Sequence, residues 1–179
     1  MTRTLICGHI DLSEEDFNKY YKSHIDNYLQ QSDAFYVGGA KGADTFAQNY
    51  LSEKEVRNVT VCDKGEQNNN LHPSKFQHKN GFASYIDRDA YMTDNVDNII
   101  VFLRKHYMSI GSGSFSNVVR LITDRIVADN FMKHSRSCKY DDTKTLEEYY
   151  GQVIDSFDEF SQGTKLALRE LVEKVMVIE

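Results

Sequence analysis

The stretch from Ala34 to Leu51, AFYVGGAKGADTFAQNYL, changes its hydrophobic period in the middle. Apolar residues alternate with a period of two before Gly38, and they recur about every four residues after Gly42. Because side chains repeat every two residues in a strand and every 3.6 in an α-helix, the pattern predicts a strand, a glycine-rich turn and a helix. A unit of this kind is typical of proteins that alternate strands and helices.

The rest of the chain repeats that alternation. Strands are expected at Thr4–Cys7, Ala34–Val37, Asn58–Cys62 and Ile99–Leu103, and helices after Ser13, after Gly42, from about Ser84 to Asp94 and from Ser114. This order predicts an α/β fold with a parallel sheet flanked by helices and joined by right-handed crossovers. The strand at Ile99–Leu103 has no polar alternation, which indicates a strand covered on both faces.

The C-terminal third reads as helical. The helix from Ser114 is expected to bury Phe115, Val118, Val119, Ile122 and Ile126, and a polar segment, Lys133–Lys144, follows it. Two further apolar stripes, separated by Gly163, contain Leu146, Tyr149, Tyr150, Val153, Ile154 and Phe157, and then Leu168, Leu171, Val172 and Val175. They predict a C-terminal helical hairpin that packs either on the sheet or on a second copy of the chain, as in a homo-oligomer. We expect residues 1–132 to form one ligand-binding domain and residues 133–179 to be its helical extension.

Length and charge bound the function. A chain of 179 residues suits one domain with a full hydrophobic core and is short for two. Its net charge of −6 disfavours a broad surface for nucleic acid or for an acidic membrane, although a local basic pocket is still allowed.

The cysteines and the N-terminus exclude other classes. Cys7, Cys62 and Cys138 are far apart and form no C-x-x-C pair, so neither a disulfide framework nor a metal site is indicated. The apolar run near the N-terminus is too short for a signal peptide or a membrane span, so we expect a cytoplasmic protein. We expect no cofactor.

Glycine-bearing turns mark the expected ligand site. In open parallel sheets, ligands bind beyond the carboxyl ends of the strands, where glycines let backbone N–H groups approach an anion and helix N-termini favour negative charge. The turn residues expected there are Gly8 and His9, then Gly38, Gly39, Ala40, Lys41, Gly42 and Asp44, and lastly Gly111, Ser112, Gly113 and Ser114. Each also has an ordinary interpretation, as a tight turn, a helix N-cap or an acid in a first helical turn. The placement of all three turns at one predicted edge of the sheet is what favours a phosphate or carboxylate site.

Three motifs in order resemble one family. The hinge GGAKGADTFA resembles the GGA-(R/K)-G-(I/V/A)-D-x-x-A element of the SLOG superfamily of YpsA-like and DprA-like proteins. The stretch RDAYMTDNVDNIIVF, Arg88–Phe102, is similar to an element of the Lonely-guy-like members, and SGSFSN, Ser112–Asn117, resembles their G-G-T-x-x-E phosphate loop. The resemblance covers about the first 130 residues and implies a Rossmann-like domain that binds a nucleotide or a nucleotide-derived ligand.

The resemblance also implies a role for Arg88, which stands where the hydrolase members have the arginine that helps cleave the N-glycosidic bond of a nucleoside monophosphate. Asn117 replaces their glutamate, and an amide cannot act as a carboxylate base. We therefore expect a binding or sensing protein, with an N-glycoside hydrolase or transferase as the alternative. Other acids near the expected edge are Asp44, Asp87, Asp89 and Asp94, whereas Asp97 is expected to be a structural turn residue.

The polar segment Asp63–Gly81 predicts a long loop or lid. Lys75, His78 and Lys79 in it would close over an anionic ligand, and Phe76 and Phe82 would either stack on a base or pin the loop to the core. A third hypothesis leaves the pocket without a ligand and makes the protein an interaction module that works through its C-terminal helices.

Overall fold

The computed structural model describes residues 1–65 and 76–179 and divides the chain into two compact units, residues 1–101 and 102–179. Each unit is described by itself below. The domain boundary expected after residue 132 falls inside a helix of the second unit, so the helices expected to flank the sheet after residue 102 belong with the C-terminal helices instead.

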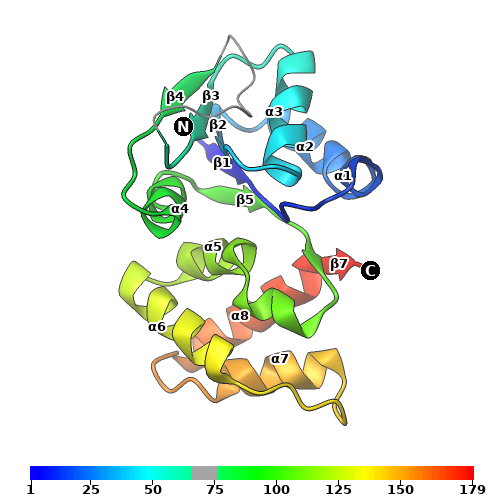
Figure 1. Ribbon diagram of the computed structural model, residues 1–179, viewed down its shortest axis with the longest axis vertical. Coiled ribbons are helices and arrows are strands. Elements are labelled where there is room, and N and C mark those ends of the chain that lie inside the picture. Colours follow the sequence, from blue (N-terminus) through cyan, green and yellow to red (C-terminus); the bar gives the residue numbers. More distant parts are fainter. Residues whose placement is uncertain (66–75) are drawn as a thin grey trace. The chain divides into compact units, whose positions relative to one another are not determined.

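The first unit is a parallel five-stranded sheet with four helices among its described residues (Figure 1). Its elements are β1 (Arg3–Ile6), α1 (Glu14–Tyr20), α2 (Lys22–Leu29), β2 (Ala34–Gly38), α3 (Ala43–Glu53), β3 (Val59–Cys62), β4 (Gln77–Lys79), α4 (Tyr85–Asp94) and β5 (Asn98–Ile100). The strand order is β4-β3-β2-β1-β5, so the direction of winding reverses between β1 and β5. The predicted α/β, Rossmann-like class is confirmed.

Helices cover both faces of this sheet. The ring of Tyr36 in β2 lies 6.5 Å from that of Tyr91, which marks the face that α4 covers. Phe35 and Val37 point the opposite way, because successive strand side chains alternate, and both are fully buried or nearly so. The crossovers from β1 to β3 run in one direction and the crossover from β4 to β5 in the other, so right-handed connections place α1–α3 opposite α4. Figure 1 shows α1–α3 grouped apart from α4.

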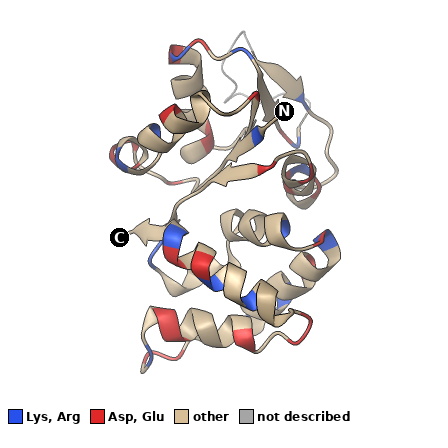
Figure 2. Cartoon of the chain, turned by 180° about the vertical axis from the view of Figure 1, so that it is seen from behind, with Lys and Arg blue, Asp and Glu red and all other residues tan. Residues whose placement is uncertain are grey.

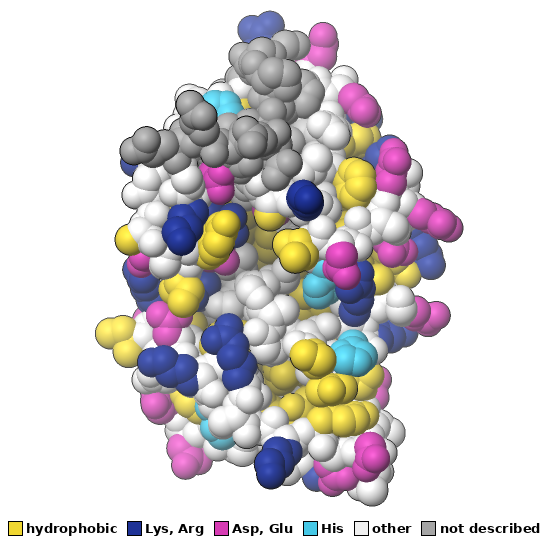
Figure 3. Space-filling model, in the orientation of Figure 1, with side chains coloured by type: hydrophobic (Ala, Val, Ile, Leu, Met, Phe, Trp, Pro, Cys, Tyr) yellow, Lys and Arg dark blue, Asp and Glu magenta, His cyan; other side chains and the backbone are white. Residues whose placement is uncertain are grey.

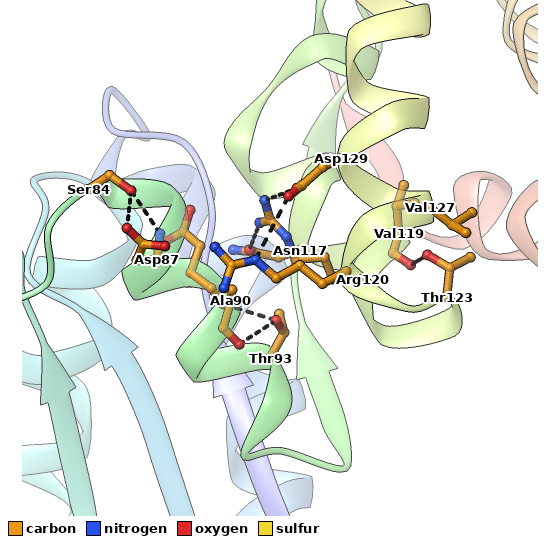
Figure 4. A network of polar contacts seen from close by, with 12 residues as sticks. Ser84, Asp87, Ala90, Thr93, Asn117, Val119, Arg120, Thr123, Val127 and Asp129 are labelled. Carbon is orange, nitrogen blue, oxygen red and sulfur yellow. Dashed lines mark hydrogen bonds and ion pairs between the residues drawn. The ribbon is translucent and has the colours of Figure 1, made fainter.

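Two helices of the first unit start where the sequence predicts, and each start is capped by a serine. The Ser13 hydroxyl accepts a hydrogen bond from the Asp16 amide (3.1 Å) at the start of α1, and the Ser84 hydroxyl accepts one from the Asp87 amide (3.0 Å) at the start of α4 (Figure 4). A cap of this kind stabilises a helix by about 1 kcal/mol. Both helices therefore begin where their sequences predict.

The expected loop at Asp63–Gly81 contains a short strand. β4 pairs with β3 in parallel register, with Thr60 opposite Gln77 and Cys62 opposite Lys79. All three β4 residues are exposed and polar, so the strand has no alternation of apolar and polar residues from which it could be predicted. Pro73 and Lys75, which belong to the same expected loop, lie outside the described residues.

The second unit is mainly helical. Its elements are β6 (Leu103–Arg104), the 3₁₀ helix η1 (Tyr107–Gly111), α5 (Gly113–Ile122), α6 (Arg125–Ser137), α7 (Leu146–Asp155), α8 (Gln162–Val175) and β7 (Met176–Ile178). α7 and α8 form the predicted hairpin and contact each other. The rings of Phe131, Phe157 and Phe160, each buried, lie 4.7–5.3 Å apart at the centre of the unit.

Two predictions in this region were wrong in detail. The apolar run Ile99–Leu103 is divided, because β5 ends at Ile100 and Leu103 pairs with Met176 in a separate two-stranded sheet. The helix from Ser114 also ends early, at Ile122, because the Asp124 carboxylate accepts a hydrogen bond from the Val127 amide (3.0 Å) and caps a new helix. Ile126 in that new first turn is 74% exposed rather than buried.

The apolar stripe of α7 is buried inside its own unit. Tyr149 meets Tyr107 and Tyr140 edge to face, and Phe157 meets Phe131 and Phe160. These partners all belong to residues 102–179, so the stripe is buried without the sheet or the second copy that the sequence predicts as its partner, and it gives no argument for a second copy.

Charges are mixed over both units. Figure 2 shows acidic and basic positions interspersed along the helices, and Figure 3 shows no continuous basic area on the face it displays. Within residues 1–65 and 76–179, no helix has the length and apolar character needed to cross a membrane.

Gly42 offers a test of the hinge. Its φ is +69°, and a Cβ there would collide with the backbone of His9 and Ile10. We expect Gly42→Ala to destabilise the protein by more than about 2 kcal/mol, since strained backbone and steric overlap add. Urea unfolding measures the loss.

Gly81→Ala is the matched control. Gly81 also has a positive φ, +81°, but a Cβ there would meet nothing within 4 Å. It should cost only the backbone term, about 1–2 kcal/mol. Equal losses for the two variants would contradict the close packing assigned to the hinge.

Candidate functional site

The turns after β1 and β2 meet at the carboxyl edge of the sheet. The Ala43 amide, at the start of α3, donates to the His9 carbonyl (3.1 Å), and Gly42 packs directly on the backbone of His9 and Ile10. A side chain on Gly8 would overlap Ala43 and the Tyr21 hydroxyl, which donates to the Cys7 carbonyl (3.0 Å). Gly8, His9 and the hinge are therefore brought together, as the sequence predicts.

The hinge is closed by side chains of α3. Asp44 Oδ2 accepts a hydrogen bond from the Ala40 amide (3.1 Å), and Thr45 Oγ1 donates to the Ala40 carbonyl (2.8 Å). Gln48 Nε2 donates to the Gly38 carbonyl (3.0 Å). The anion held by this glycine-rich turn is thus the protein's own carboxylate. We had expected a ligand anion to be held there.

Arg88 lies beside that carboxylate. Its Nε and Nη2 atoms both donate to Asp89 Oδ1, at 2.9 and 2.7 Å, and the side chains of Arg88 and Asp89 are only 11% and 12% exposed. A Cβ on Gly38 would overlap Asp44 and lie 3.5 Å from Arg88 Nη1. Glycine at position 38 is therefore explained by the close approach of the Asp44 carboxyl group, which a larger residue would displace, independently of any ligand.

Burial and charge set the protonation of this site. Burial raises the pKa of Asp44 to about 6, although the Arg88 guanidinium and the Ala40 amide oppose the shift. Burial lowers the pKa of Arg88, but the carboxylates of Asp89 and Asp44 outweigh it and the net shift is upward. Arg88 therefore stays charged, while Asp44 exchanges its proton close to neutral pH.

Two residues at the end of β3 complete the site. Asp63 is buried, its carboxylate accepts from the Lys64 amide (2.8 Å), and it adds negative charge near Asp44. Burial raises the pKa of the Cys62 thiol to about 12, so this cysteine stays protonated and is no nucleophile. We call Asp44, Asp63, Arg88 and Asp89 the carboxylate cluster.

The carboxylate cluster carries more acid than base. One guanidinium faces three carboxyl groups, so an anion placed among them would be repelled, whereas hydroxyl groups would find acceptors. Within the described residues, no group of three or more His, Cys, Asp and Glu side chains is arranged to hold a metal ion.

The other predicted acids have structural roles or lie on the surface. Asp87 accepts from the Ser84 hydroxyl (2.7 Å) at the start of α4, as Figure 4 shows. Asp94 is exposed at the end of α4, and the Asp97 carboxylate accepts from the Arg3 amide (2.9 Å). Lys41 is exposed in the hinge and Gly39 is buried. Of the four acids predicted near the ligand site, only Asp44 and Asp89 lie close to Arg88 in the described structure.

The third predicted turn belongs to the second unit. β6 and η1 stand between β5 and this turn, so Gly111–Ser114 does not directly follow a strand of the large sheet. Ser112 caps α5, accepting from the Phe115 amide (3.1 Å), and Arg136 Nε donates to the Gly111 carbonyl (3.3 Å). Gly113 and Ser114 form the first turn of α5.

Asn117 also has a partner inside that unit. Its Oδ1 accepts from Arg120 Nη1 (3.4 Å), and Arg120 Nη2 donates to Asp129 Oδ1 (2.9 Å), which joins α5 to α6 (Figure 4). The residue that replaces the glutamate of the resembled motif thus takes part in a buried polar link between two helices.

The expected lid is only partly described. Lys75 lies outside the described residues, and His78 and Lys79 are exposed in β4. Phe76 is 6% exposed, and the ring of Phe82 lies 5.3 Å from that of Tyr91. Both phenylalanines are therefore packed against the protein, which agrees with the second of the two roles expected for them.

One groove in the second unit is not predictable from the apolar pattern of the sequence. A groove of about 1090 Å³ runs along α7 and α8, with Tyr150, Ile154 and Val172 among its lining residues. The same residues read as a core stripe in the sequence, since periodicity does not reveal where a core is left open.

Comparisons of the chain with protein-family models, with curated proteins and with solved structures found no match.

Asp44→Asn tests the buried acid. Because the pKa of Asp44 is raised in the folded protein, Asp44 contributes stability below about pH 4 that is lost as the pH rises through about 6. We expect the stability difference between Asp44→Asn and the wild type to grow in favour of Asn, by up to about 3 kcal/mol, between pH 4 and 7. Urea unfolding at several pH values measures it.

Asp94→Asn serves as the control, because Asp94 is an exposed acid in the same unit. It should leave the pH dependence of stability nearly unchanged. A difference between Asp44→Asn and wild type that stays constant from pH 4 to 7 would show that Asp44 titrates normally.

Proposed function

We propose that the first unit binds a nucleotide or a nucleotide-derived phosphorylated ligand at the carboxyl edge of its sheet. The observation that carries the proposal is the carboxylate cluster, in which Asp44, Arg88 and Asp89 are buried together behind a glycine hinge. Open parallel sheets bind their ligands at this edge. Strongly perturbed ionisable groups gather at functional sites more often than elsewhere. The resemblance of the hinge and of the Arg88 stretch to SLOG proteins points to the same class of ligand.

Charge decides how such a ligand would lie. At an effective dielectric constant of 20, two like unit charges about 6 Å apart repel by about 3 kcal/mol. A phosphate among the carboxylates of the cluster would therefore be disfavoured, whereas sugar hydroxyls would donate to them. We place the sugar against Asp44 and Asp89 and the phosphate outward, toward the exposed Lys41 and Lys64.

Arg88 is a positioning residue in this proposal. Two of its N–H groups fix Asp89, and its charge keeps the neighbouring carboxylates available as acceptors. The ligand would be held by its sugar through the acids and by its phosphate through lysines on the rim.

A ligand panel and two variants test the proposal. We expect at least one of AMP, GMP, CMP, UMP and ADP-ribose to raise the melting temperature of the wild type, since binding to the folded state adds about 2.7 kcal/mol of stability when the ligand concentration is 100 times Kd.

Lys41→Ala should weaken the binding of a nucleotide about tenfold, or about 1.4 kcal/mol, and leave the binding of the matching nucleoside unaffected. Arg88→Lys should weaken both, because it disturbs the sugar contacts. Differential scanning fluorimetry and calorimetry read these effects.

Lys54→Ala is the control for Lys41, because Lys54 is a part-exposed lysine at the opposite end of α3. Its variant should bind nucleotide as the wild type does. The absence of a thermal shift with every compound in the panel would refute the proposed ligand class and favour the interaction-module hypothesis.

A second candidate is cleavage of an N-glycosidic bond in such a ligand. The observation that favours it is the pKa of Asp44, raised by burial to about 6, near Asp89, whose side chain accepts two hydrogen bonds from Arg88. Two carboxyl groups with different environments are the usual arrangement for acid catalysis of glycoside cleavage. Asp44 would give its proton to the departing base as the C1′–N bond breaks, and Asp89 would stabilise the positive charge on the sugar. Water would then add to C1′ and return a proton to Asp44.

Release of free base from nucleoside monophosphates tests this second candidate. We expect a rate that falls as the pH rises through about 6, because the acid form of Asp44 is lost, and a loss of more than 100-fold in Asp44→Asn. Nucleotide binding without any base release would leave the binding function and remove the enzymatic one.

A further inference from the structure

Tyr85 is the exposed aromatic residue beside the carboxylate cluster. It is the first residue of α4, directly after the Ser84 cap shown in Figure 4, and 58% of its surface is accessible. The Ser84 hydroxyl accepts a hydrogen bond from the Asp87 amide and donates one to the Asp87 carboxylate. These two hydrogen bonds hold the backbone of the first turn of α4, which includes Tyr85. Isolated exposed tyrosines are common, so its surroundings must decide what it does.

Two cations connect the ring to the cluster. Arg88 Cζ lies 5.1 Å from the centroid of the Tyr85 ring, and Lys64 Nζ lies 5.4 Å from it. The same guanidinium donates to Asp89 and lies next to Asp44. The ring thus stands at the edge where β3 and the start of α4 meet the acids that we assign to the sugar.

Other aromatic residues of this stretch are committed to packing. Phe76 is buried, and the rings of Phe82 and Tyr91 pack on each other. Tyr85 has an accessible ring together with neighbouring positive charge, which is the combination that stacks on nucleic acid bases.

We infer that Tyr85 stacks on the base of the ligand, so that this unit takes nucleotides with an aromatic base and not sugar phosphates alone. The inference rests on the proposed function. In this arrangement the sugar lies between the base on Tyr85 and the acids of the cluster, and the flexible Lys64 moves from the ring toward the phosphate.

Matched ligands and variants separate this inference from the proposed function. AMP, GMP, CMP and UMP are compared with ribose 5-phosphate, which lacks the base, by isothermal calorimetry on the full chain. Tyr85→Ala should weaken the best-bound nucleotide by about 5- to 150-fold, the range for loss of one stacked base, and leave ribose 5-phosphate unchanged. Tyr85→Phe should stay within about twofold of the wild type. Tyr20→Ala is the control, because Tyr20 also has a lysine ammonium near its ring, 4.8 Å from the centroid.

The outcomes are distinct. If Tyr85→Ala changes neither ligand, or weakens both equally, the stacking role is overturned and the proposed site survives. If the wild type binds neither a nucleotide nor ribose 5-phosphate, both the site and the stacking role are overturned. A selective loss of the nucleotide that Phe restores supports both.

Discussion

The buried ion pair of Arg88 with Asp89, close to the carboxyl group of Asp44, is the constraint on which the first unit depends. Removing Arg88 would leave the buried carboxyl group of Asp89 without its cation, and breaking a buried pair in this way typically costs 3–5 kcal/mol. The Arg88 side chain brings α4 to the end of β2, because Asp44 and Arg88 both lie close to Gly38. It also explains the hinge, since a side chain at Gly38 would displace Asp44. The glycine-rich motif is therefore shaped by an internal ion group as well as by any ligand.

That constraint changes the chemistry expected of the site. A glycine turn at a helix N-terminus suggests a phosphate cradle, but here Asp44 occupies the Ala40 amide. In the proposed complex, the excess of acid would keep the phosphate outside the cluster, and the carboxyl groups inside it would accept hydrogen bonds from hydroxyl groups. Tyr85, whose ring adjoins Arg88, then offers a surface for a base. One arrangement of charges thus orders the sugar, the phosphate and the base of the proposed ligand.

The sequence predicts local features better than partners. The helix starts near Ser13 and Ser84 and the hinge at Gly42 follow from short-range rules, and the structure confirms them. β4 was missed because its residues are exposed and polar, and the run Ile99–Leu103 was read as one strand because apolar pattern does not name the partner strand. The placement of Arg88 near Asp44 brings together residues that are far apart in the chain, and sequence spacing cannot reveal it. Tyr85 carried no signal, since an exposed tyrosine fits any helix start.

The most direct test of the carboxylate cluster is the titration of Asp44 by carbon-detected NMR of its carboxyl group. The account predicts a midpoint at about pH 6, raised by burial beside the other acids. It also predicts that the midpoint moves further up in Arg88→Lys, because a weaker cationic partner stabilises the ionised form less. A midpoint near the ordinary value of about 4, unchanged by that substitution, would contradict a buried Asp44 coupled to Arg88.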